Sequence, residues 1–170
     1  DSAASLVAEG KTVVLVTLNI HSTEIASSQE SVELLHELAT HDTPQMKSIL
    51  DNTIVLLIPS LNPDGQQIVT DWYRKTLGTP AEGSSPPELY HHYAGHDNNR
   101  DWFMYNLAES RHTARILYRE WFPEIVYDQH QMGASGPRIF LPPYEDPVNP
   151  NIPAALTAQS RRATAAYDQY

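Results

Sequence analysis

The sequence predicts an α/β fold in which a mixed, mostly parallel sheet is flanked by helices. Two apolar runs of strand length, TVVLVTL at residues 12–18 and TIVLLI at residues 53–58, are nearly continuous. Such runs are typical of strands that are buried on both faces of a sheet. The segment between them, EIASSQESVELLHEL, places Ile25, Val32, Leu35 and Leu38 near helical spacing. Strand, helix and strand in this order indicate a parallel sheet.

The segment after the second strand is interpreted as turn and loop. SLNPDG, residues 60–65, combines Asn before Pro with Asp-Gly, both of which favour turns. Residues 78–95 are rich in Pro, Gly and Ser and predict a long loop. Loops of this length in a compact domain are usually functional or mobile.

The second half of the chain continues the alternation of helices and strands. A helical pattern runs from about residue 106 to residue 121 and stops before Pro123. EIVYD predicts a third strand and RIFL, residues 138–141, a fourth. A proline-rich stretch follows, and an amphipathic pattern then predicts a terminal helix that runs to Tyr170 without a stop signal.

Composition narrows the classes of function. The 170 residues fit one domain, and the formal net charge of −10 without basic runs argues against nucleic acid or an anionic membrane as partner. No apolar stretch approaches the ~20 residues of a membrane span. The chain has no Cys, so a bound metal would need His, Asp or Glu. Because the chain starts at Asp1 and ends within a helical pattern, we expect a single, partial domain over residues 1–170.

Polar residues that could bind a metal follow two of the predicted strands. His21 and Glu24 come after the first strand, and His130 comes just after the third. Open α/β sheets bind ligands beyond the carboxyl ends of their strands. Two histidines and one carboxylate form a known catalytic zinc set with a fourth position for water. Alternatively, His21 and Glu24 are polar residues at a helix start, and His130 pairs with Asp128 in the core.

Five stretches in a common order carry a resemblance to a known family. They are HSTE, IPSLNPDG, WYRKT, GHDNNRDW and YDQHQMG, and they extend from residue 21 to residue 133. In these stretches the sequence resembles the zinc metallocarboxypeptidases of the M14, or carboxypeptidase A-like, family. The resemblance implies a three-layer sandwich, here truncated at the C-terminus, that binds one zinc ion.

The resemblance also implies roles for individual residues. It makes His21, Glu24 and His130 the zinc ligands and Asp97 the carboxylate that orients the first zinc histidine. Arg74 matches the catalytic arginine that contacts the substrate, polarises the scissile carbonyl and stabilises the oxyanion. Asn99 and Arg100 match the pair that binds the terminal carboxylate of the substrate. A guanidinium suits this task because it grips a carboxylate with two parallel hydrogen bonds.

The expected function is therefore zinc-dependent removal of C-terminal residues from peptides by metal-activated water. The partner is a peptide or peptide-like substrate with a free C-terminal carboxylate, and family habit suggests a secreted or periplasmic protein. Two alternatives stay open. One is a zinc amidohydrolase or deacylase acting on acylated amino acids or cell-wall peptides, and the other is a non-catalytic peptide-binding module.

The sequence departs from the family in one respect. Family members have a glutamate base and a closing tyrosine well after the last zinc histidine. Beyond His130 the only glutamate is Glu145, which lies in the proline-rich stretch. We therefore assign no base, expect it beyond Tyr170, and expect this chain alone to be inactive.

Overall fold

The computed structural model describes residues 5, 8–88, 90–133, 135 and 149–167. The chain forms two compact units, Asp1–Gln131 and Met132–Tyr170, which are treated separately below. The second unit contains the predicted terminal helix, α6 (Ala154–Tyr167), whereas the expected strand at 138–141 lies outside the described residues. No helix in the described ranges is long and apolar enough to cross a membrane.

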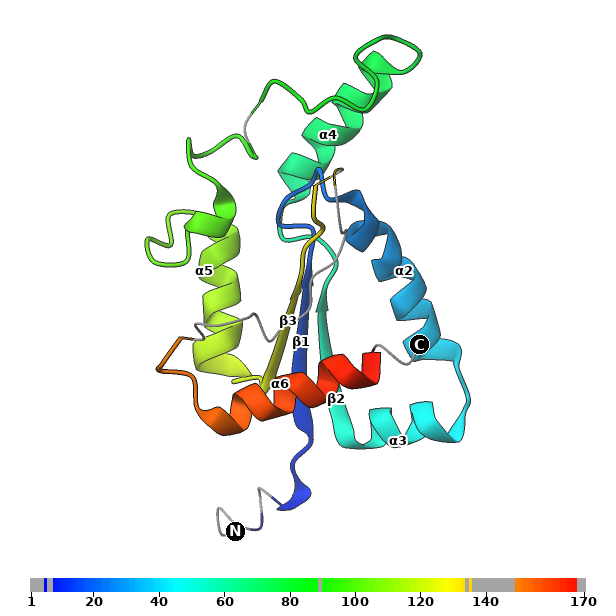
Figure 1. Cartoon of the computed structure of the whole chain (residues 1–170), viewed down its shortest axis with the longest axis vertical. Coiled ribbons are helices and arrows are strands. Elements are labelled where there is room, and N and C mark those ends of the chain that lie inside the picture. The colour runs from blue at the N-terminus through cyan, green and yellow to red at the C-terminus, as the bar shows by residue number, and fades with distance from the viewer. Residues whose placement is uncertain (1–4, 6–7, 89, 134, 136–148, 168–170) are drawn as a thin grey trace. The chain divides into compact units, whose positions relative to one another are not determined.

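The first unit is built on a parallel sheet, as the sequence predicts. Its strands are β1 (Thr12–Leu18), β2 (Thr53–Ile58) and β3 (Ile125–Gln129), and their order is β2-β1-β3. Both neighbours run parallel to β1. The carboxyl ends of the three strands therefore lie at one edge of the sheet (Figure 1).

The hydrophobic core surrounds the central strand. Leu15 and Leu18 are almost completely buried, while Val13 and Thr17 complete the buried positions of β1. Helices α2 (Ile25–Thr40) and α5 (Ala108–Arg115) lie on opposite sides of the sheet (Figure 1). Strand β3 occupies an edge among the described strands, and all but its last residue are exposed.

Helix α2 confirms the predicted helix but buries a different face. Ile25, Val32 and Leu35 are 49%, 72% and 58% exposed, whereas Ser27 and Ser31 are buried. The small serines allow close approach of the helix to its neighbours. Each serine hydroxyl donates to a backbone carbonyl three residues earlier, which satisfies its hydrogen bonding. The apolar spacing therefore predicts the helix correctly but not its orientation.

Two further helices were not expected from the sequence. These are α3 (Pro44–Asn52) and α4 (Pro63–Thr76). The SLNPDG segment, interpreted above as a turn, is in fact the start of α4. The side chain of Asn62 accepts a hydrogen bond of 3.0 Å from the backbone N–H of Gly65, and Pro63 occupies the first helical position. Asn and Pro favour turns and helix starts for the same stereochemical reasons.

The segment after α4 contains the predicted loop and the predicted second helix. Among the described residues between α4 and residue 97 there is neither helix nor strand, and a short 3₁₀-helix, η1 (Asn98–Arg100), follows. Helix α5 continues into one turn of π-helix, η2 (Ile116–Glu120), close to the predicted end before Pro123. Through this loop and η1 the chain returns to the carboxyl edge of the sheet, where Asp97 contacts His21.

Candidate metal centre

The chain leaves β1 through an unusual backbone conformation. Asn19, directly after the strand, is buried and has a φ of 60°, in the left-handed region that asparagine tolerates better than most residues. Its side-chain oxygen accepts a hydrogen bond of 2.9 Å from Ser60 Oγ, which follows β2. The backbone N–H of Glu24 then donates to the carbonyl of His21 at 2.9 Å. This turn places the side chains of His21 and Glu24 together beyond the sheet edge.

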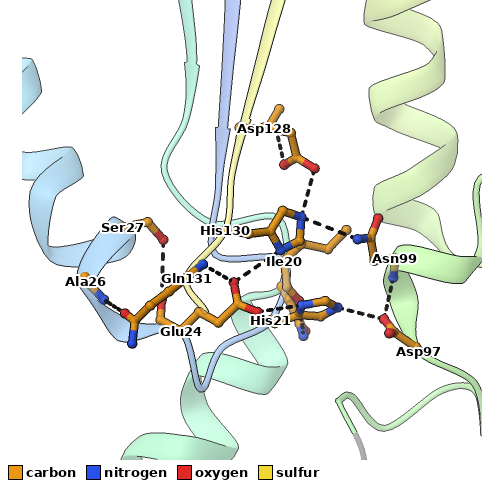
Figure 2. Close-up of polar contacts among 12 residues, drawn as sticks. Ile20, His21, Glu24, Ala26, Ser27, Asp97, Asn99, Asp128, His130 and Gln131 are labelled. Atoms are coloured by element: carbon orange, nitrogen blue, oxygen red, sulfur yellow. Dashed lines mark hydrogen bonds and ion pairs between the residues drawn. The ribbon is translucent and has the colours of Figure 1, made fainter. Parts of the chain in front are cut away.

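Three side chains form a group that could hold a metal ion (Figure 2). Glu24 lies between the two histidines: its Oε1 is 2.8 Å from His21 Nδ1, and its Oε2 is 3.2 Å from His130 Nδ1. One ligand atom from each residue lies within 4.8 Å of the others. Tetrahedral bonds of ~2.0–2.1 Å require ligand atoms roughly 3.3 Å apart. The donor types fit zinc, and the two distances from Glu24 to the histidines, 2.8 and 3.2 Å, are close to this spacing.

The outward-facing ring nitrogens of both histidines contact carboxylates. His21 Nε2 is 2.9 Å from Asp97 Oδ1, a contact that the family resemblance implies (Figure 2). His130 Nε2 is 3.1 Å from Asp128 Oδ2, whereas the sequence alone suggests only that these two residues pair in the core. A carboxylate behind a ligating histidine fixes the tautomer of the ring and raises its basicity.

Asp128 could have been identified from its spacing. It lies two residues before His130 at the end of a strand, and residues two apart in a strand project from the same face. Extending the strand pattern by one residue past Gln129 would place the side chains of Asp128 and His130 on the same face.

In the metal-free protein, the carboxylates of the cluster raise the pKa values of its histidines, and the histidines lower the pKa of Glu24. Hydrogen bonds that His130 donates to Asp128 and Glu24 raise its pKa to about 10, against a smaller opposing effect of burial. The hydrogen bond with Glu24 is also the main cause that raises the pKa of His21. Burial raises the pKa of Glu24, but hydrogen bonds with His130 and His21 outweigh it and lower the value to about 2. Metal binding must therefore release a proton from His130.

The backbone of the Glu24 region is tied to the segment after β3. Gln131 donates its backbone N–H to Glu24 Oε2 at 2.7 Å, and its side-chain oxygen accepts from Ala26 N at 3.3 Å. Tyr90, from the loop after α4, packs its ring against His21 with 5.0 Å between ring centroids. The ligand group is thus held by segments from three distant parts of the sequence.

Asn99 is close to the cluster, and Arg100 adjoins it. Asn99 Nδ2 lies 3.4 Å from His130 Nε2, and its Oδ1 accepts a hydrogen bond of 2.8 Å from Trp102 Nε1. Arg100 is exposed, and one guanidinium nitrogen donates to the carbonyl of Asn99 at 3.0 Å. A guanidinium carries five N–H groups, so this one contact does not use all of its donors.

Arg74 occupies a different position. It lies in the last turn of α4, its side chain is 73% exposed, and its guanidinium is 3.8 Å from Asp71 on the same helix. None of its described contacts reaches the His21–Glu24–His130 group. Its role at the scissile carbonyl therefore stays a prediction from the resemblance.

A parallel sheet that carries two histidines and a glutamate beyond its carboxyl edge has the donor set of a catalytic zinc site. The family model Peptidase_M14, zinc carboxypeptidase, matches residues 2–143, and the chain belongs to this family. No curated protein matches the chain. Membership supports a zinc-dependent hydrolase of the carboxypeptidase type, whose substrates are peptides.

Proposed function

We propose that this chain carries the metal centre and the carboxylate-binding residues of an enzyme that removes C-terminal residues from peptides. The observation that carries the proposal is the convergence of His21, Glu24 and His130 on one point beyond β1 and β3. Family membership supplies the zinc and the peptide substrate class. Zinc bound there would supply the Lewis acidity that makes water nucleophilic near neutral pH.

The remaining residues act on the ligands or on the substrate. Asp97 and Asp128 hold the two imidazole rings so that each Nδ1 points toward Glu24. Asn99 and Arg100 offer amide and guanidinium donors to the terminal carboxylate of a peptide, beside His130. Arg74 is assigned to the scissile carbonyl, where a cation stabilises charge that develops in the transition state. A movement of the end of α4 or of the substrate is needed to bring Arg74 there.

Metal binding by this chain tests the ligand assignment. Equilibrium dialysis followed by metal analysis should find about one zinc per wild-type chain. His130→Ala should lose most of this zinc, whereas His112→Ala, which changes a histidine in α5, should retain it. Unchanged zinc content in His130→Ala would remove the basis of the proposal.

Peptide binding separates the carboxypeptidase from its alternatives. The zinc-loaded chain should bind an N-acylated peptide with a free C-terminus more tightly than the same peptide amide, because Asn99 and Arg100 recognise the carboxylate. Equal binding of acid and amide would favour an amidase-like site. Release of the C-terminal residue from the bound peptide distinguishes an enzyme from a binding module. We extend the proposal to a secreted or periplasmic location on family habit alone.

A further inference from the structure

A small cavity lies next to η1 and the loop segment at His91 and Tyr93. Its lining comes from the start of α4, from the loop at His91 and Tyr93, and from η1 and the first turn of α5. The space open to the centre of a water molecule is about 10 Å³. A single water needs roughly 10–15 Å³ of such space. The cavity therefore has the size of one water molecule.

Two polar atoms on its lining residues lack partners. His91 and Asn98 are 7% and 6% exposed, and His91 Nε2 and Asn98 Oδ1 have no hydrogen-bond partner among the described residues. Buried polar atoms are almost always hydrogen-bonded, to protein or to ordered water. Two unpartnered atoms on the lining of one cavity point to a shared ligand.

Their hydrogen-bonding types are opposite and fixed by their neighbours. His91 Nδ1 lies 3.1 Å from the backbone N–H of Tyr93, which can only donate, so Nδ1 accepts and the neutral ring carries its proton on Nε2. Asn98 Nδ2 lies 2.7 Å from the carbonyl of Ile20, which can only accept, so the amide orientation is set and Oδ1 is the free acceptor. The cavity thus has one donor and one acceptor to satisfy.

We propose that one ordered water molecule binds here, accepting from His91 Nε2–H and donating to Asn98 Oδ1. Its second O–H can donate to a carboxylate, because Asp64 and Glu109 also line the cavity. Buried waters typically make about three hydrogen bonds, which matches this lining. A cation is disfavoured because the N–H of His91 would face it.

The water connects the loop to the residues that orient the metal ligands. Asn98 lies between Asp97, which contacts His21, and Asn99, which is close to His130. A bridge from His91 to Asn98 therefore braces η1 against the preceding loop. This site is independent of the proposed function, since it rests on buried atoms outside the ligand group.

A crystal structure and nitrogen NMR of the chain test the proposal without substitutions. We expect a water within hydrogen-bond distance of His91 Nε2 and Asn98 Oδ1, and the tautomer of His91 that carries its proton on Nε2. A metal ion in the cavity, a direct contact between the two side chains, or the Nδ1-protonated tautomer would each overturn it.

A matched pair of substitutions measures the contribution to stability. His91→Phe removes the donor and should lower Tm by roughly 3–8 °C, because Asn98 Oδ1 stays buried and unpaired. His92→Phe changes the neighbouring, exposed histidine and should shift Tm by no more than about 2 °C. Equal shifts in the two variants would count against the water, and crystals of folded His91→Phe should show the cavity without it.

Discussion

Thr17 and Asp128 face each other across the parallel pairing of β1 and β3, and Thr17 Oγ1 donates a hydrogen bond of 2.7 Å to Asp128 Oδ1. The other oxygen of Asp128 contacts His130 Nε2 at 3.1 Å. The central strand thus fixes the carboxylate, and the carboxylate fixes the imidazole. Together with the contact between Asp97 and His21, each histidine of the ligand group has its own carboxylate.

Asp128→Asn should weaken zinc binding about 10–100-fold, the usual cost of losing the carboxylate behind a ligating histidine. Asparagine keeps the shape but removes the charge that supports the imidazole. Thr17→Val, which removes only the hydrogen bond to Asp128, should cost less, roughly 2–10-fold. Zinc affinities from competition with a chromophoric chelator measure both effects.

The control for this pair is Asp51→Asn, an equally conservative change at an exposed position in α3. It should leave the affinity for zinc unchanged. If Asp128→Asn binds zinc as tightly as Asp51→Asn does, Asp128 does not position His130.

Arg100→Lys should reduce the preference of the zinc-loaded chain for peptides with a free C-terminus. Lysine keeps the charge but loses the planar pair of donors that matches a carboxylate. We expect affinity for the peptide acid to fall about 10-fold and affinity for the amide to change little. Calorimetric titration of both peptides measures the difference.

Arg119→Lys provides the control for Arg100, because Arg119 is an exposed arginine in η2, outside the proposed carboxylate site. Its discrimination between acid and amide should equal that of the wild type. Wild-type discrimination in Arg100→Lys would show that another residue recognises the carboxylate.

Asp101 gives a prediction for the dependence of stability on pH. Its carboxylate is fully buried, and burial raises its pKa. Hydrogen bonds from Ser110, from the backbone N–H of Leu107 and from His96 outweigh the effect of burial. The pKa of Asp101 is therefore lowered from 3.8 to about 2. A group with a lowered pKa stabilises the fold above its unfolded value and loses that effect as pH falls through the folded value. The charged form therefore contributes about 2 kcal/mol above pH 4.

Asp101→Asn should remove this contribution, so the difference in unfolding free energy from wild type should be largest above about pH 4 and shrink toward pH 2. Urea denaturation of the metal-free proteins across this range measures it. A difference that stays constant down to pH 2 would mean that Asp101 does not act through its charge.

The sequence predicts the three strands of the first unit well because their apolar runs are nearly continuous and their order is simple. It predicts the grouping of His21 and His130 because the carboxyl ends of parallel strands meet at one edge. Asp97 joins the group from a distant loop, and only the resemblance, not the periodicity, pointed to it. Because Asp97 and His21 are far apart in the sequence, no local sequence pattern indicates that their side chains meet.

What the sequence does not predict depends on packing between elements. The buried face of α2 carries Ser27 and Ser31, and no periodicity of apolar residues identifies it. The start of α4 is not predicted because Asn62 and Pro63 favour a turn as well as a helix start. The pairing of Thr17 with Asp128 depends on the register of β1 against β3, and the residues of the two strands do not specify that register.

Gly65 is a position where the backbone has no room for a side chain. A Cβ added there would lie 2.4 Å from Asn62 Nδ2 and 2.4 Å from the carbonyl oxygen of Tyr90. Asn62 caps α4 and also donates to the carbonyls of Ile20 and Tyr90 at 3.0 and 2.7 Å. An alanine would therefore disturb the helix start and the segment that packs on His21.

Gly65→Ala should lower Tm by roughly 3–10 °C, because the clash involves backbone and exceeds the ~1 kcal/mol by which alanine favours a helix over glycine. Gly95→Ala is the matched control, since a Cβ there meets nothing within 4 Å. That variant should keep the wild-type Tm or raise it slightly. Thermal unfolding followed by circular dichroism compares them. A Gly65→Ala protein as stable as Gly95→Ala would show that Asn62 and Tyr90 yield easily, and that the loop over His21 is held less tightly than these contacts indicate.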